Sequence, residues 1–169
     1  MFAAILRITE VEGGDRRAMF RRLDLTEIAA GAAEAIEVLA DEKGQTLRLG
    51  PWAPAPIDGD ERLLTQLVVN LVENAVNHTP PGSILAVSVT READAAVLTV
   101  ADDGPGIPQG ERDRVFDPFH RLRARGTGSG LGLNLVRQVM TLHGGAALAL
   151  EAPAGGTIMR LEFVESAQG

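Results

Sequence analysis

Four short motifs follow one another in a fixed order through the second half of this 169-residue chain. The first, NLVENAVNH at 70–78, lies on a predicted helix, and the second, DDGPGI at 102–107, follows an apolar strand. The third is FDPF at 116–119, and the fourth, GTGSGLGL at 126–133, leads into another predicted helix. Each motif alone is weak, because Gly-rich turns and helical Asn residues are common. Their order predicts one composite site, and this constrains the fold more than any other feature.

Hydrophobic periodicity fills in the elements between the motifs. Apolar residues recur at helical spacing in three segments, and Thr26 and Asp60 are candidate caps for the first two. Residues 51–56, PWAPAP, are expected to form a rigid loop. The pattern predicts an α+β fold, a two-layer α/β sandwich whose mixed five-stranded sheet is covered on one face by about three helices. The predicted helices span 25–43, 61–78 and 131–143, and the strands span 45–49, 57–58, 84–91, 95–101, 146–151 and 157–164.

Composition excludes several classes of protein. The net charge of −7, from 16 basic and 23 acidic residues, argues against a nucleic-acid surface, which needs clustered Lys and Arg. The chain has no cysteine, so a disulfide framework and thiolate chemistry are excluded. No apolar run approaches about 18 residues, and the start does not have the pattern of a signal peptide. We therefore expect a segment that is not inserted in a membrane, in a cytoplasmic setting.

The set of motifs resembles the ATP-binding catalytic domain of bacterial sensor histidine kinases, in the superfamily that also holds the gyrase, Hsp90 and MutL ATPases. The resemblance covers residues 20–165. It implies the Bergerat fold with a mobile lid over ATP, and Mg²⁺ as the metal. It also implies two parts, with 1–22 as the C-terminal remnant of a dimerisation helix plus linker and 23–166 as the ATP-binding catalytic domain. The resemblance also leaves room for a parent protein that is anchored in a membrane.

The first motif carries the predicted metal site. Asn70 and Asn74 are four residues apart, so both amides project from one face of the helix. An amide oxygen is a hard, neutral ligand suited to Mg²⁺, which takes other ligands from phosphates and water. The resemblance implies that Asn74 binds the metal directly and that Asn70 supports the metal or the phosphates, which makes both candidate catalytic residues.

Position 70 also indicates the type of reaction. Relatives that hydrolyse ATP carry Glu there to activate water, whereas the amide of Asn70 cannot accept a proton usefully. The resemblance therefore implies a domain that holds ATP for transfer to another nucleophile. Many histidine kinases have Lys or Arg where this chain has Asn77, so phosphate neutralisation is expected to depend on Mg²⁺ and on arginines of the lid. His78 is expected to border the nucleotide sugar or phosphates.

The second motif is the predicted adenine site. Asp102 follows an apolar strand, and its carboxylate would accept a hydrogen bond from the exocyclic amine of adenine. Gly104 and Gly106 would let the backbone approach the base, and Ile107 would give the base an apolar wall. The resemblance adds Thr157, in the final Gly-Gly-Thr motif, as a lining residue of the same pocket.

The last two motifs frame the predicted lid, 117–130. Phe116 and Phe119 are expected to anchor its base in the core. The following helix would receive phosphate at its N-terminus, although no Gly-Lys-Ser or Gly-Lys-Thr is present and the loop is not a Walker A motif. One of three lid arginines is expected to reach the γ-phosphate. The candidate catalytic arginines are Arg121 and Arg125, with Arg123 between them, and the predicted phosphate cradle comprises Gly128, Ser129, Gly130, Leu131 and Gly132.

The three histidines of the chain indicate whether it carries its own phosphoacceptor. None of His78, His120 and His143 lies in the His-Glu-Leu-Arg-type context of a phosphoacceptor. The resemblance therefore implies a kinase domain that phosphorylates a histidine on a separate dimerisation domain, upstream of a response regulator, and that is monomeric by itself. Two alternatives remain open: a nucleotide-binding regulatory module, and an anti-sigma-type Ser/Thr kinase of the same superfamily. Asn70 argues against a third, a free-standing ATPase.

Overall fold

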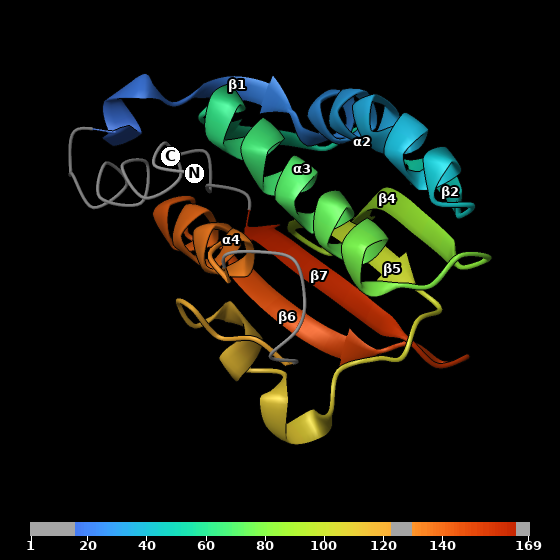
Figure 1. Ribbon diagram of the computed structural model, residues 1–169. Helices are drawn as coiled ribbons and strands as arrows, with labels where there is room; N and C mark the ends of the chain where they lie inside the picture. Colours follow the sequence, from blue (N-terminus) through green and yellow to red (C-terminus); the bar gives the residue numbers. More distant parts are fainter. Residues whose placement is uncertain (1–15, 123–129, 165–169) are drawn as a thin grey trace.

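One mixed five-stranded sheet forms the base of the domain (Figure 1). The computed structural model describes residues 16–122 and 130–164. The strand order is β2-β4-β5-β7-β6, with β2 parallel to β4 and all other neighbours antiparallel. The predicted mixed sheet is therefore confirmed. Its strands are β2 (Thr46–Trp52), β4 (Ile84–Glu92), β5 (Ala95–Asp102), β6 (Ala146–Glu151) and β7 (Thr157–Val164).

Strand β2 runs further than predicted. It continues through Pro51 to Trp52, where the sequence suggested the start of a rigid loop. Strand β2 is the first strand in the sheet order, and among the described residues it pairs only with β4. An edge strand tolerates proline because one side of its backbone needs no ladder partner.

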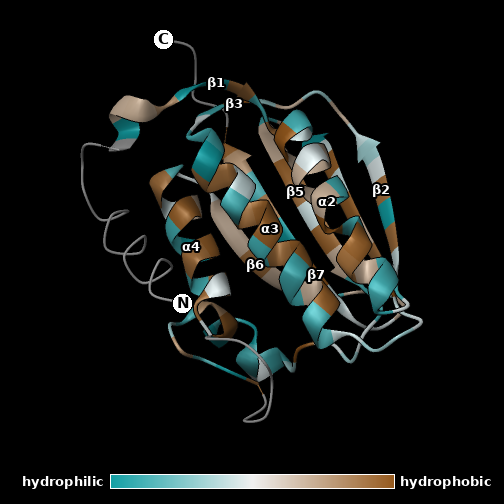
Figure 2. Cartoon of the chain, turned by 45° about the horizontal axis from the view of Figure 1, so that its top comes forward, coloured by the Kyte–Doolittle hydropathy of each residue, from teal (hydrophilic) through white to brown (hydrophobic). Residues whose placement is uncertain are grey.

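Three α-helices in the described residues lie on one face of the sheet (Figures 1 and 2). They are α2 (Leu25–Glu42), α3 (Glu61–His78) and α4 (Gly132–Leu142). Asp60 caps α3 as predicted, but α2 is capped by Asp24, whose Oδ1 accepts from the backbone N–H of Thr26 at 2.9 Å. The predicted Thr26 cap is wrong by two residues. None of the helices in the described ranges is long and apolar enough to cross a membrane.

The core lies between the helices and the sheet. Leu64, Leu67 and Val68 of α3 are fully buried, and so are Val87 of β4 and Leu98 of β5. Burying one such side chain stabilises the fold by about 1.5–3 kcal/mol. Figure 2 shows the three helices lying over the sheet, with hydrophobic and hydrophilic residues alternating along each of them. This packing fixes α3 and α4, whose polar faces carry the predicted site.

A second, two-stranded sheet joins the N-terminal segment to the domain. Strand β1 (Arg21–Asp24) pairs antiparallel with β3 (Pro56–Gly59), and a 3-10 helix, Arg16–Met19, precedes it. The expected linker boundary, between residues 22 and 23, lies within β1. Residues 1–15, the rest of the predicted helix remnant, lie outside the described residues.

His143 links this N-terminal segment to the ends of two helices. Its ring stacks on Phe20, with ring centroids 4.5 Å apart. Nε2 accepts from the backbone N–H of Asp60 at 3.2 Å, and Nδ1 lies 2.7 Å from the Val139 carbonyl oxygen. Because Asp60 N–H is a donor, Nε2 must be unprotonated and Nδ1 must carry the hydrogen. The packing therefore requires a neutral ring, and burial lowers the pKa of His143 below its ordinary value.

This requirement predicts a loss of stability on mild acidification. The pKa of His143 is lower in the folded than in the unfolded chain because of burial, which the hydrogen bond to Val139 and the charge of Asp60 oppose and Arg17 reinforces. The unfolded chain binds more protons as pH falls through the ordinary value of 6.5, so the free energy of unfolding decreases. Urea denaturation at about pH 7 and pH 5 should show this decrease in wild type and a smaller one in His143→Gln. Equal decreases in the two proteins would contradict the assignment.

Candidate functional site

Two of the three asparagines in the first motif lie on one side of α3. Asn70 and Asn74 are both half-buried. Asn70 Oδ1 accepts a hydrogen bond from Gln66 Nε2 at 3.3 Å, which orients its amide along the helix. The first residue of α4, Gly132, lies beside Asn70, since a Cβ added to Gly132 would come 4.0 Å from Asn70 Cβ. Paired amide oxygens on one helix face fit a Mg²⁺ ion that takes its remaining ligands from phosphate and water.

The last turn of α3 faces the adenine motif. Asn77 and His78 are exposed there, as expected for residues that border a ligand. His78 lies near enough to Asp102 to lower the pKa of that carboxyl slightly. The helix thus extends from the α4 terminus at Asn70 to the second motif at His78. One ligand lying along α3 would meet both.

Asp102 is the last residue of β5 and pairs with Thr157, the first residue of β7. Its Oδ1 accepts from the backbone N–H groups of Gly104, at 2.9 Å, and Thr157, at 3.3 Å. Burial is the main reason that the pKa of Asp102 lies above its ordinary value, and the two hydrogen bonds oppose it. Thr157 itself is buried. The structure thus brings together Asp102 and Thr157, which the sequence placed in one pocket.

Glycines are required in this loop and in the turn before β7, because other atoms approach them closely. A Cβ on Gly104 would lie 2.6 Å from Thr79 Cγ2, and a Cβ on Gly156 would lie 2.0 Å from the Asp102 carbonyl oxygen. Gly106 has φ +74 and would bring a Cβ to 3.2 Å from the Gly156 carbonyl oxygen. A side chain at any of these positions would displace the loop. Ile107 follows, half-buried against the core.

The two ends of the lid meet at the start of α4. The backbone N–H of Phe119 donates to the Gly130 carbonyl oxygen at 3.0 Å. Gly130 has φ +70, and a Cβ there would lie 3.0 Å from Phe119 Cα. Leu131 is buried and Gly132 begins α4, whose free N–H groups and dipole favour an anion. Arg121 is exposed beside this junction.

Part of the predicted lid falls in 123–129, outside the described residues. The candidate catalytic Arg125 and the neighbouring Arg123 belong to it. Gly128 and Ser129 of the predicted cradle belong to it as well. Their roles remain predictions.

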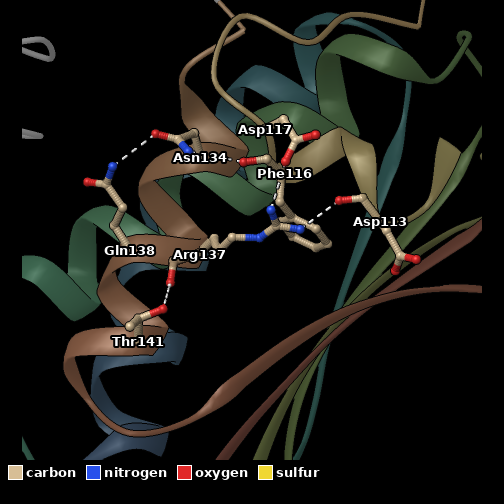
Figure 3. A network of polar contacts seen from close by, with 7 residues as sticks. All are labelled: Asp113, Phe116, Asp117, Asn134, Arg137, Gln138 and Thr141. Atoms are coloured by element: carbon tan, nitrogen blue, oxygen red, sulfur yellow. Dashed lines mark hydrogen bonds and ion pairs between the residues drawn. The ribbon is translucent and has the colours of Figure 1, made fainter.

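The base of the lid is held by a network on α4 (Figure 3). The Arg137 guanidinium lies over the Phe116 ring, 5.1 Å from its centroid, and donates to Asp117 Oδ1 at 2.8 Å. Asn134, which is buried, donates from Nδ2 to the Phe116 carbonyl oxygen at 3.1 Å. Phe116 is 2% exposed and is the anchor that the sequence predicted. The prediction that Phe119 is a second anchor is wrong. Phe119 is 70% exposed and has φ +63, and the turn that leads to Gly130 directs its side chain outward.

Sequence reasoning missed several residues that support the site. Asn134 and Arg137 are three apart on one face of α4, a spacing that the sequence does show. Thr79, buried against Gly104, follows the first motif directly, but its role depends on a contact with a loop that is distant in sequence. Helical spacing could therefore have identified Asn134 and Arg137, whereas no pattern in the sequence marks Thr79.

Comparison with known proteins agrees with this geometry. Residues 59–167 match the family described as "Histidine kinase-, DNA gyrase B-, and HSP90-like ATPase". The chain is 38% identical over 144 residues to the sensor protein CutS of Streptomyces coelicolor, covering 82% of this chain and 34% of CutS. It is 30% identical over 166 residues to the sensor histidine kinase TmoS of Ectopseudomonas mendocina, covering 94% of this chain and 17% of TmoS. The matched part of this chain therefore spans about a third of CutS and about a sixth of TmoS.

Solved structures agree as well. The mycobacterial sensor histidine kinase MprB superposes with a TM-score of 0.75 at 30% identity, covering 86% of this chain and 97% of that chain. Full-length ShkA in complex with AMPPNP gives a TM-score of 0.80 at 25% identity, covering 97% of this chain and 35% of that chain. The predicted Bergerat-like sandwich is confirmed. The chain belongs to the family of histidine kinase-, DNA gyrase B- and HSP90-like ATPases, as the catalytic ATPase domain of a sensor histidine kinase.

Proposed function

We propose that this domain binds ATP with Mg²⁺ and transfers the γ-phosphate to a histidine on a separate dimerisation domain, from which a response regulator is phosphorylated. One observation carries the proposal. The paired amides of α3 have the start of α4 at one end, where Gly132 lies beside Asn70, and the loop of Asp102 at the other, where Thr79 packs against Gly104. The two ends match the two ends of a nucleotide, phosphate and base.

Each residue has a defined task in this arrangement. Asp102 accepts from the adenine amine, while Gly104, Gly106, Ile107 and Thr157 shape the pocket around the base. Mg²⁺, when bound, would neutralise phosphate charge, with Asn74 as its ligand and Asn70 as support. The N–H groups from Gly130 to Gly132 face the phosphates. Asn77 and His78 border the sugar and phosphates, and Arg121 or Arg125 supplies positive charge to the γ-phosphate.

The reaction then needs little more than alignment. Phosphoryl transfer is catalysed mainly by positioning and by charge neutralisation, and the imidazole nitrogen of the acceptor is itself the nucleophile. The P–N bond forms as the bond from the γ-phosphorus to the bridging oxygen of ADP breaks. Asn70 cannot act as a general base for water, so the site favours this acceptor over hydrolysis.

The proposal predicts transfer without appreciable hydrolysis. A chimera in which this chain replaces the matching segment of CutS, given ATP labelled at the γ-phosphate and Mg²⁺, should carry label on the CutS histidine segment. The label should be acid-labile and base-stable, as a phosphoramidate is. The isolated chain should acquire no label on its own histidines. Rapid release of phosphate by the isolated chain, or label on Ser or Thr, would contradict the proposal.

A further inference from the structure

Gln45 reaches from the turn between α2 and β2 to the end of α3. It is 4% exposed, and its Nε2 donates to Thr79 Oγ1 at 2.8 Å, to the Thr79 carbonyl oxygen at 2.9 Å and to the Val76 carbonyl oxygen at 3.0 Å. An amide has two hydrogens, so these three acceptors share them. A buried polar side chain that bonds only one short, distant segment holds that segment in place.

The end of α3 depends on such partners. The last carbonyl groups of a helix accept no hydrogen bond from within the helix, and two of them here belong to the buried residues Ala75 and Val76. Lys43 donates to the Val76 carbonyl oxygen from the same turn. Thr79 in turn donates from Oγ1 to the Ala75 carbonyl oxygen at 2.9 Å. Residues 43–45 therefore complete the last turn of α3, which carries Asn77 and His78.

Thr79 extends this support to the adenine loop. Its Cγ2 would lie 2.6 Å from a Cβ on Gly104, so the methyl group is packed directly against the Gly104 backbone. The N–H of Gly104 donates to Asp102 Oδ1 at 2.9 Å. A chain of contacts thus runs from the Gln45 amide through the Thr79 methyl and the Gly104 backbone to the carboxylate expected to read adenine.

We propose that Gln45 is a positioning residue for adenine recognition, which acts through Thr79 and Gly104 on the orientation of Asp102. The inference rests on the proposed nucleotide site. A simple helix cap would make the same hydrogen bonds and contribute stability alone. The two roles differ in what a substitution does to base selectivity, because only a positioning residue couples to Asp102.

Gln45→Met removes the donor while keeping the length of the side chain. Ile36→Val is the matched control, since Ile36 is buried on α2, takes no part in the contacts described above, and its truncation also lowers stability moderately. Displacement of a fluorescent ATP analogue by ADP and by GDP gives both dissociation constants for each protein, and thermal melting gives the stability. Both variants should melt below wild type.

The proposal predicts that only Gln45→Met changes recognition. Loss of one hydrogen-bonded support should weaken ADP binding by about threefold to tenfold and reduce the preference for ADP over GDP by a similar factor. A wild-type ADP dissociation constant and selectivity in a Gln45→Met protein that melts early would overturn the inference and leave the proposed function standing. Failure of the wild-type chain to bind ADP would overturn both.

Two further variants keep the test decisive. Gln45→Asn retains the amide and shortens its reach, so it replaces Gln45→Met in the same comparison if that variant does not fold. Thr79→Ser retains every hydroxyl hydrogen bond and removes only the methyl group that contacts Gly104. We expect Thr79→Ser to weaken ADP binding. We also expect Thr79→Ser and the folded Gln45 variant to shift the amide NMR resonance of Gly104. An unshifted Gly104 resonance in a folded Gln45 variant would contradict the proposed route.

Discussion

Asp102→Asn is expected to weaken ADP binding by about tenfold to hundredfold, the range for loss of a hydrogen bond to a charged group. The Asn Oδ1 can still accept from the backbone N–H groups of Gly104 and Thr157, as the carboxylate does at 2.9 Å and 3.3 Å. The loop should therefore keep its shape. The second position of the side chain becomes an NH₂ group, which faces the adenine amine donor to donor. Calorimetric titration with ADP measures the loss.

The same substitution should leave the ligand-free domain at least as stable as wild type. Burial raises the pKa of Asp102, so its ionised form is disfavoured in the folded chain. The stability that protonation contributes is fully present below the unfolded value of 3.8 and is lost as pH rises through the folded pKa. At neutral pH the cost of the charge is present in wild type and absent in the variant. A melting temperature well below wild type would show that the carboxylate is needed for folding instead.

Asp103→Asn is the matched control for charge. Asp103 is the neighbouring carboxylate, it is exposed, and its Oδ1 accepts from the backbone N–H of Ile84 at 2.9 Å. It faces β4 and not the proposed pocket. Asp103→Asn should keep the wild-type ADP dissociation constant. Equal losses in the two variants would mean that net charge, and not contact with adenine, accounts for the effect of Asp102.

Asn74→Ala is expected to remove the gain in nucleotide affinity that Mg²⁺ provides. Loss of a group that supports a metal site costs about tenfold to hundredfold in metal affinity, and loss of the ligand itself should cost no less. The domain should stay folded, because Asn74 is half-buried and Ala is the better helix former. Titration with the ATP analogue in Mg²⁺ and in EDTA gives the two affinities, which should become nearly equal in the variant.

Glu73→Ala separates the metal role from a general effect of charge or helix packing. Glu73 adjoins Asn74 but lies about 100° around the helix. Its replacement should leave the Mg²⁺-dependent gain as in wild type. A folded Asn74→Ala protein with the full gain would disprove the metal assignment.

Local patterns in the sequence predicted most of the sheet and helices. The strand at 84–91 alternates, the one at 95–101 is nearly continuously apolar, and the helix that ends at His78 has an apolar stripe, so each element is specified by its own residues. Of the two-stranded sheet, only strand β3 was predicted. Strand β1 reads Arg-Arg-Leu-Asp, which has no alternation, and it becomes a strand only because β3 lies beside it.

The site was predictable where the residues that bind the ligand lie within one short motif, next to the residues that shape its backbone. Asp102 with its glycines, and Asn70 with Asn74, are such cases. Phe119 was misread because its position depends on the turn that returns to Gly130, a contact across the lid. Thr79 and Gln45 were not predicted for the same reason, since their roles arise from packing between segments that are distant in sequence.

The central claim, a Mg²⁺-dependent adenine nucleotide site along α3, is tested most directly by calorimetry on this chain. ADP and an unhydrolysable ATP analogue would be titrated first with Mg²⁺ and then with EDTA. The account predicts micromolar-range binding, of about −8 kcal/mol, that weakens when Mg²⁺ is removed. A folded protein that binds neither nucleotide would contradict it, and so would one that binds both as tightly in EDTA as in Mg²⁺.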